Sequence, residues 1–238
     1  MISKRNKVLF YFSAALIILT TSCASNLTMQ TAKVLPEGVI STGGAVAISP
    51  NGRELISQYS DKPDKYEQDY KNDYNGESVE RPTVNPWFMM KYGLGGSCDI
   101  GLNISPNALE GDFKYQAINY ENLFLALGII SHYGYAPDVS DDEPGIHSFD
   151  IILPLYISYD FTSRYAVYGA GKYIIRNIYS KRDDVYTVDS PRYLVSGTLG
   201  NKIKYTDSDS VLFELCVNKD LGINFYSAQF NVGATQEY

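Results

Sequence analysis

The sequence is poor in the residues that most catalytic and metal sites use. Its 238 residues include only two histidines, three cysteines and one tryptophan. This leaves little material for a metal centre or an activated thiol. Basic residues are also fewer than acidic ones, 20 against 27, whereas phosphate binding needs a basic face. We therefore expect no cofactor, no metal ion and no nucleic-acid partner.

The sequence also shows no internal linker, no repeat of 20–50 residues and no strong amphipathic helix after residue 38. Apolar residues make up 45% of the chain and charged residues 20%, which excludes a disordered protein. The unusual abundance is that of tyrosine, with 21 residues. A single folded domain rich in aromatic side chains is expected.

The N-terminus has the pattern of a secretory signal. Basic residues precede a twelve-residue apolar run, Val8–Leu19, which is too short for a membrane-spanning helix. We predict a signal peptide at 1–22. Its removal takes away three basic residues and no acidic ones, so the mature chain has 17 basic residues against 27 acidic ones.

Cys23 directly follows the small residues Thr20, Thr21 and Ser22. This arrangement resembles the cleavage site of bacterial lipoproteins, in which the cysteine becomes the lipid-modified first residue. The resemblance implies an acyl anchor such as palmitate on Cys23, a leader at 23–37 and sorting to the outer membrane. The alternative is an ordinary signal peptide that is cut nearby.

From residue 38 onward, apolar and polar residues alternate with a period of two. From Phe149 to Tyr159 the odd-numbered residues are all apolar or aromatic, which is typical of a β-strand with one apolar face. The same pattern recurs along the chain. It predicts ten strands, at 38–48, 85–93, 98–104, 111–119, 122–133, 147–159, 163–176, 192–204, 209–218 and 223–236.

The connections between these strands alternate in length. Tight turns are predicted at every second connection, and the long polar connections at 49–84, 134–146 and 177–191 fall on the opposite side. This is the pattern of membrane barrels, in which short turns and long loops occupy opposite ends. We therefore predict an all-β fold over 38–238, a single antiparallel up-and-down transmembrane β-barrel of about ten strands.

The two faces of the predicted strands differ in charge. One face is nearly free of charge, as lipid contact requires. The tyrosines near strand ends, such as Tyr159 and Tyr165, are expected in an aromatic girdle at the membrane interface. Pro154 interrupts a good strand, and we expect a bulge there because proline cannot donate to the ladder.

Three segments resemble small bacterial outer-membrane barrel proteins of the porin-like superfamily. They are Gln30–Gly38 ahead of the first strand, Lys91-Tyr-Gly-Leu at a strand end, and Cys98-Asp-Ile-Gly-Leu102. The last strand ends on aromatic Tyr238, which resembles the signal read by the barrel-assembly machinery, although Gln236 departs from it. The resemblance covers most of 30–238 and implies outer-membrane lipids and that machinery as partners.

The opposite face places charged side chains in the lumen. The candidate residues are Asp150, Arg164, Lys172, Arg176 and Glu214. They can form a structural network of ion pairs, because an unpaired buried charge is costly, or they can line a selective cavity for a small solute.

The remaining candidate residues for a metal or catalytic site give weak signals. His132 and His147 flank an acidic stretch, which is either a divalent-cation site or an ordinary solvated loop. Ser131 cannot pair with His132 because adjacent strand residues point to opposite faces. Cys98 and Cys216 also have opposite parity, so we predict that both are free thiols. No catalytic residue is assigned.

The leading functional hypothesis is a narrow porin-like barrel for a small solute, located in the outer membrane and without enzymatic activity. The first alternative is a surface interaction or adhesion protein that acts through its long loops, including the tyrosine-bearing loop 49–84. The second alternative is a periplasmic, lipid-tethered carrier similar to lipocalins.

Overall fold

The computed structural model describes residues 28–49, 83–136, 146–182, 185–188, 191–222 and 226–238. None of these residues lies in a helix long and apolar enough to cross a membrane. The described residues form eleven strands: β1 (Ile40–Ser49), β2 (Thr83–Gly95), β3 (Cys98–Ser105), β4 (Ala108–Tyr120), β5 (Leu123–Ala136), β6 (Ile146–Asp160), β7 (Tyr165–Arg182), β8 (Val185–Val188), β9 (Arg192–Lys204), β10 (Asp209–Asp220) and β11 (Tyr226–Glu237).

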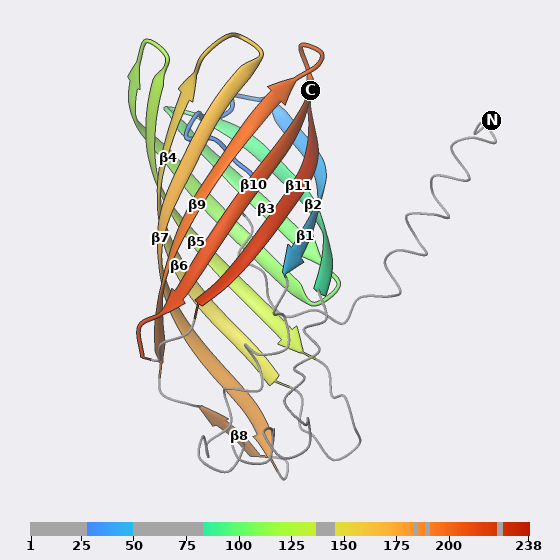
Figure 1. Ribbon diagram of the computed structural model, residues 1–238, viewed down its shortest axis with the longest axis vertical. Coiled ribbons are helices and arrows are strands. Elements are labelled where there is room, and N and C mark those ends of the chain that lie inside the picture. The colour runs from blue at the N-terminus through green and yellow to red at the C-terminus, as the bar shows by residue number, and fades with distance from the viewer. Residues whose placement is uncertain (1–27, 50–82, 137–145, 183–184, 189–190, 223–225) are drawn as a thin grey trace, which may run out of the picture.

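Ten of these strands close into one barrel (Figure 1). Each strand pairs with its neighbours in antiparallel fashion, β1 closes against β11, and β6 pairs with both β5 and β7. β8 pairs only with the end of β7 and takes no part in the closure. The predicted single antiparallel up-and-down barrel of about ten strands is therefore confirmed.

The two-residue turn between β3 and β4 lies at one end of the barrel. Four other tight turns lie at the opposite end, which also holds the start of β1 and the C-terminus (Figure 1). They connect β2 to β3, β4 to β5, β6 to β7 and β9 to β10. The first of them is made by Gly95, Gly96 and Ser97, all with positive φ, a conformation that glycine adopts without strain. We refer to this end as the short-turn end.

Along each strand, side chains alternate between the lumen and the outer surface. On β6, for example, Leu153 is 46% exposed while its neighbour Ile152 is 1% exposed. The exposed side chains form an apolar outer surface on all sides, including Phe88, Ile100, Phe113, Leu127, Leu155, Ile157, Leu199, Leu215 and Phe230. A closed sheet with such a surface suits lipid, where every backbone group needs an internal partner.

Aromatic side chains gather near both ends of the outer surface. Phe161 packs edge-on against Tyr159, with ring centroids 4.9 Å apart, and it also contacts Tyr165 at the short-turn end. Toward the other end Tyr173 stacks on Tyr193, with ring centroids 6.2 Å apart. Amphipathic rings prefer the membrane interface, so these pairs fit the two edges of an apolar band.

The predicted bulge at Pro154 is wrong. The register between β6 and β7 continues through the Pro154–Lys172 pair without a shift, and β5 keeps the same register with β6 on both sides of it. The proline ring instead lies over Gly128, where a Cβ atom would come within 3.0 Å of it. A missing side chain on β5 thus accommodates the proline. Register shifts occur at Gly93/Gly95 and at Gln116/Ile118.

The segment 177–191, expected as a loop, contains regular structure. β7 extends to Arg182 and is 18 residues long, and its last residues pair with β8. At about 3.3 Å per residue this strand is longer than a membrane is thick. The β7–β8 ladder therefore projects beyond the barrel on the side opposite the short-turn end (Figure 1).

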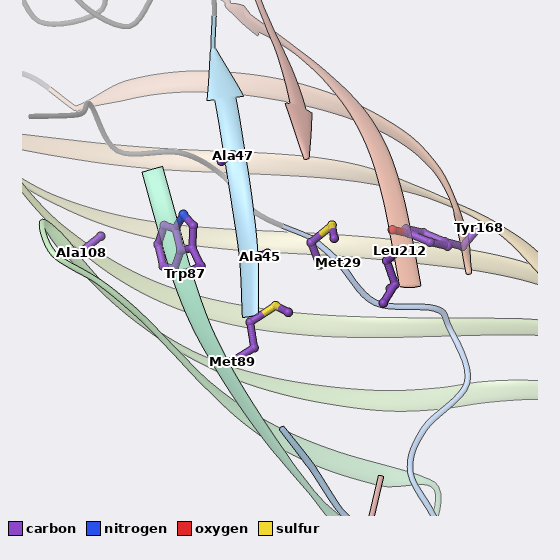
Figure 2. Close-up of a cluster of buried hydrophobic side chains, with 8 residues drawn as sticks. All are labelled: Met29, Ala45, Ala47, Trp87, Met89, Ala108, Tyr168 and Leu212. Carbon is purple, nitrogen blue, oxygen red and sulfur yellow. The ribbon is translucent and has the colours of Figure 1, made fainter. Parts of the chain in front are cut away.

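Buried apolar side chains lie inside the barrel in three groups. One group surrounds Met29, which comes from the segment before β1 and lies among Ala45, Met89 and Leu212 (Figure 2). A second is a level row of side chains that face one another across four neighbouring strands: Ile130, Ile152, Ile174 and Leu194. The third surrounds Ala32 and includes Phe124, Ala126, Tyr156 and Ala170.

Candidate functional site

The segment before β1 runs through the inside of the barrel. We call residues 28–37 the strap. Thr28, Met29, Gln30 and Ala32 are all buried, and none of the strap belongs to a strand. Ladder hydrogen bonds begin only at its end, where Gly38 N–H donates to the carbonyl of Gly93 over 3.0 Å. Interior side chains of the barrel wall hold the rest.

Glu214 of β10 holds the inner end of the strap. Its carboxylate accepts the backbone N–H of Met29 over 2.7 Å and that of Thr28 over 3.2 Å. Asn231 and Tyr168 also donate to this carboxylate, over 2.7 and 3.3 Å. The charge-assisted hydrogen bonds satisfy a carboxylate that is almost fully buried.

Lys114 and Asp99 hold the middle and outer parts of the strap. The Lys114 ammonium donates to the carbonyls of Thr31 and Lys33 over 3.0 and 3.1 Å, and it forms an ion pair with Asp99 over 3.2 Å. Asp99 in turn accepts the N–H of Leu35 over 3.2 Å. One buried ion pair therefore binds both a donor and two acceptors of the strap backbone.

Two neutral side chains complete the contacts with the strap backbone. Ser158 accepts the N–H of Ala32 over 3.2 Å, and Gln116 accepts the N–H of Val34 over 2.9 Å. The strap thus contacts side chains from strands that are distant in sequence. It links opposite parts of the wall from within, and its position blocks the lumen.

A second polar layer lies nearer the other end of the lumen. Cross-strand pairing places Asn103, Glu110, His132, Asp150 and Arg176 side by side on β3 to β7. Asn103 donates to the Glu110 carboxylate over 2.6 Å, and the other carboxylate oxygen lies 3.4 Å from Nδ1 of His132. Arg176 binds Asp150 through two nitrogens, at 2.6 and 3.0 Å. All five side chains are buried.

The structure places four of the five predicted lumen charges inside the barrel: Asp150, Lys172, Arg176 and Glu214 are all buried. Asp150 and Arg176 pair directly, whereas Glu214 faces the strap. The prediction for Arg164 is wrong. β6 ends at Asp160 and β7 starts at Tyr165, so Arg164 lies exposed in the intervening turn. Residues in a turn no longer alternate between two faces.

The two histidines lie on opposite sides of the wall. His132 is buried in the lumen beside Glu110, while His147 is on the outer surface, where its Nδ1 lies 2.6 Å from the hydroxyl of Tyr133. No group of three or more metal-ligating side chains occurs among the described residues. The acidic stretch between the histidines, residues 138–143, lies outside the described residues. Ser131 is exposed and His132 is buried, as their parity predicts.

Both described cysteines are free, as predicted. Cys216 is fully buried, with its sulfur 3.1 Å from the hydroxyl of Ser196, whereas Cys98 lies at the start of β3 and is partly exposed. Cys23 and the predicted signal peptide at 1–22 lie outside the described residues. So does most of the predicted loop 49–84.

The lumen leaves little room for water. Beside the strap there is a cavity of about 50 Å³, lined by residues that include Gln30, Lys91, Lys202 and Glu237. This volume accommodates only a few water molecules. Inward-facing Tyr156, Ile152 and Ile174 are at most 1% exposed, whereas the lining of an open aqueous channel would be in contact with solvent. The described lumen is therefore closed.

Sequence reasoning missed the strap and the Glu110 layer. Residues 28–37 have no regular period, and their partners lie up to 186 positions away in the chain. Glu110 and Asp112 were available as signals, because both are acidic residues that alternate with Leu109, Gly111 and Phe113 in a strand pattern. The expected strand began at 111, however, and left Glu110 outside it.

Several solved barrels align with much of this chain, each with a TM-score below 0.5. The outer membrane protease OmpT from Escherichia coli has a TM-score of 0.45 and 11% identity, covering 89% of this chain and 100% of that chain. Ail, the attachment invasion locus protein of Yersinia pestis, in complex with sucrose octasulfate, has a TM-score of 0.45 and 8% identity, covering 85% of this chain and 100% of that chain. The Neisserial surface protein NspA has a TM-score of 0.42 and 8% identity, covering 85% of this chain and 98% of that chain. No protein-family model and no curated protein matches the sequence.

At these identities, and with TM-scores below 0.5, the likenesses support no conclusion about this chain. The class of the protein rests on its own geometry: a closed antiparallel barrel, an apolar outer surface and a polar, charge-paired interior. These features define a β-barrel of the outer-membrane type. The lumen of this barrel holds its own strap, residues 28–37.

Proposed function

We propose that the protein is a barrel of the bacterial outer membrane that does not conduct solutes in the described state. It acts instead as a non-enzymatic surface interaction protein. The observation that carries this proposal is the closed lumen, where the strap and two layers of paired charges occupy the interior. A closed barrel leaves its two ends as the working surfaces. The projecting β7–β8 ladder belongs to the end that would face outward.

Single-channel recording of the purified full chain in planar bilayers tests the closed lumen. We expect no stepwise current, and steady openings would contradict the proposal. The interaction role is tested with cells that express the full chain or a variant in which residues 50–82 are replaced by a short glycine–serine turn. We expect cell–cell aggregation to fall in the variant, while heat-modifiable migration shows an assembled barrel.

The second candidate function is a narrow small-solute barrel whose pathway opens when the strap moves. It is favoured by one observation: side chains rather than a β-ladder hold the strap between Thr28 and Leu35. Such contacts can be released without opening the sheet. A current that appears only after the strap is displaced would support this candidate over the first.

We also infer that the mature chain begins with a lipid-modified Cys23 after removal of 1–22. The supporting pattern is the basic start, the short apolar run and the small residues before the cysteine. The intact mass of the protein from outer-membrane fractions should show the added acyl chains, and Cys23→Ser should lack them. An unmodified mature mass would contradict the anchor.

A further inference from the structure

The barrel wall recognises the strap mainly through its backbone. Wall side chains accept five backbone N–H groups, from Thr28, Met29, Ala32, Val34 and Leu35. The Lys114 ammonium binds two strap carbonyls. Backbone groups are common to all peptides, so this pattern of acceptors and donors fits a peptide backbone rather than one particular set of side chains.

The charged side chains of the wall are suited to binding a peptide backbone. The carboxylates of Glu214 and Asp99 accept backbone N–H groups, while the ammonium of Lys114 donates to carbonyl oxygens. A buried carboxylate or ammonium without partners is costly, and the strap supplies several of the partners here. The interior at this level is therefore built to hold a peptide backbone.

At three positions of the strap, the barrel wall also contacts the side chain. Ala32 is fully buried against Phe124, Ala126, Tyr156 and Ala170, which leaves room for a small residue only. The Gln30 amide donates to the Tyr156 hydroxyl over 2.6 Å and accepts from Lys91 and Lys114.

The third position is Met29, whose terminal methyl packs over Gly233, 2.6 Å from where a Cβ atom at that position would lie. Together these contacts define a motif. It is a peptide segment with an unbranched apolar residue, an amide and, two residues later, a small residue.

We propose that the lumen between Glu214, Lys114 and Asp99 is a binding site for a peptide segment, with the strap as its resident and exchangeable occupant. The strap is tethered at Gly38 on the short-turn end. Tethering gives the strap a high effective concentration, which keeps the site occupied until the strap is weakened or displaced. This inference does not need an interaction role at the cell surface, although both proposals rest on the position of the strap inside the lumen.

The first test fixes the strap in place. The Oγ atoms of Thr28 and Thr198 are 3.3 Å apart, so Thr28→Cys with Thr198→Cys should form a disulfide. The background carries Cys98→Ser and Cys216→Ser, because Cys216 is the cross-strand partner of Thr198. The control pairs Thr28→Cys with Thr206→Cys in the exposed β9–β10 turn. Absence of the 28–198 bond in the assembled barrel would overturn the proposal.

The second test measures exchange with a fluorescent synthetic peptide of residues 28–37. Ala32→Arg should expel the strap of the full chain, because a long charged side chain does not fit a fully buried alanine position. We expect this variant to bind the peptide on the order of a hundredfold more tightly than the unaltered chain. The oxidised 28–198 variant and a peptide with the same alanine-to-arginine change should not bind. Failure of an assembled Ala32→Arg barrel to bind would overturn the proposal.

A third measurement covers the case in which Ala32→Arg does not assemble. The chain with Thr198→Cys alone, in the same serine background, keeps its strap unaltered. A peptide carrying cysteine at the position of Thr28 should be captured as a mixed disulfide with residue 198, whereas a scrambled peptide should not. Equal capture of both peptides, or capture of neither, would contradict an exchangeable peptide site.

Discussion

Asp150 on β6 and Arg176 on β7 face each other inside the barrel and form a two-pronged ion pair. The Nη2 atom of Arg176 lies 2.6 Å from one carboxylate oxygen, and its Nε atom lies 3.0 Å from the other. Both side chains are almost wholly removed from solvent. The pair lies one layer beyond the apolar row at Ile152 and Ile174, and it adjoins His132 on β5.

Removing one partner of this pair should destabilise the barrel strongly. We expect Asp150→Ala or Arg176→Met to lower the free energy of unfolding by about 3–5 kcal/mol, because the remaining charge stays buried. The double variant should lose much less free energy of unfolding than the two single variants lose together. Urea titration of the barrel in detergent, followed by the fluorescence of Trp87, measures all three. Additive losses would show that the two groups do not depend on each other.

Parity along the strands predicted this pair, since residues 150 and 176 both fall on the charged face of the alternating pattern. The same rule failed at Arg164 because the predicted strand 163–176 began two residues before β7, which starts at Tyr165, and so included a residue of the turn. Sequence alternation thus indicates the side of the wall on which a residue lies but not the residue at which a strand begins or ends. It also cannot reveal contacts such as those of the strap, which depend on closure of the whole sheet.

Glu214→Ala should release the inner end of the strap. The change removes the acceptor for two strap N–H groups and for Asn231, so we expect a loss of about 3 kcal/mol in the free energy of unfolding. It should also make trypsin cut faster after Lys33, whose side chain is already 56% exposed.

Glu237→Ala is the matched control for this experiment. Glu237 lies at the rim of the barrel and pairs with Lys202 over 2.9 Å, without a hydrogen bond to the strap. Partly exposed pairs contribute about 1 kcal/mol or less, so a small effect is expected. Equal effects of the two variants on cleavage after Lys33 would contradict the role assigned to Glu214.

Leu153→Arg tests whether the outer surface faces lipid. Leu153 is in the middle of β6 and points outward, and an arginine at mid-membrane depth costs about 2–4 kcal/mol in a barrel. Assembly into heat-modifiable barrel should fall sharply. Ser163→Arg introduces the same side chain in the exposed β6–β7 turn and should assemble normally. Normal assembly of Leu153→Arg would mean that this face meets water.

The two described cysteines should differ in reactivity. Cys98 lies at the short-turn end and is partly exposed, whereas Cys216 faces the lumen with no exposed surface and contacts Ser196. A maleimide applied to the folded barrel should therefore label Cys98 and leave Cys216 unmodified until urea unfolds the protein. The non-reducing mass should show no bond between them, because a disulfide cannot cross from one face of the wall to the other. Rapid labelling of Cys216 in the folded state would mean that reagent enters the lumen, and the closed interior on which the proposed function rests would then be wrong.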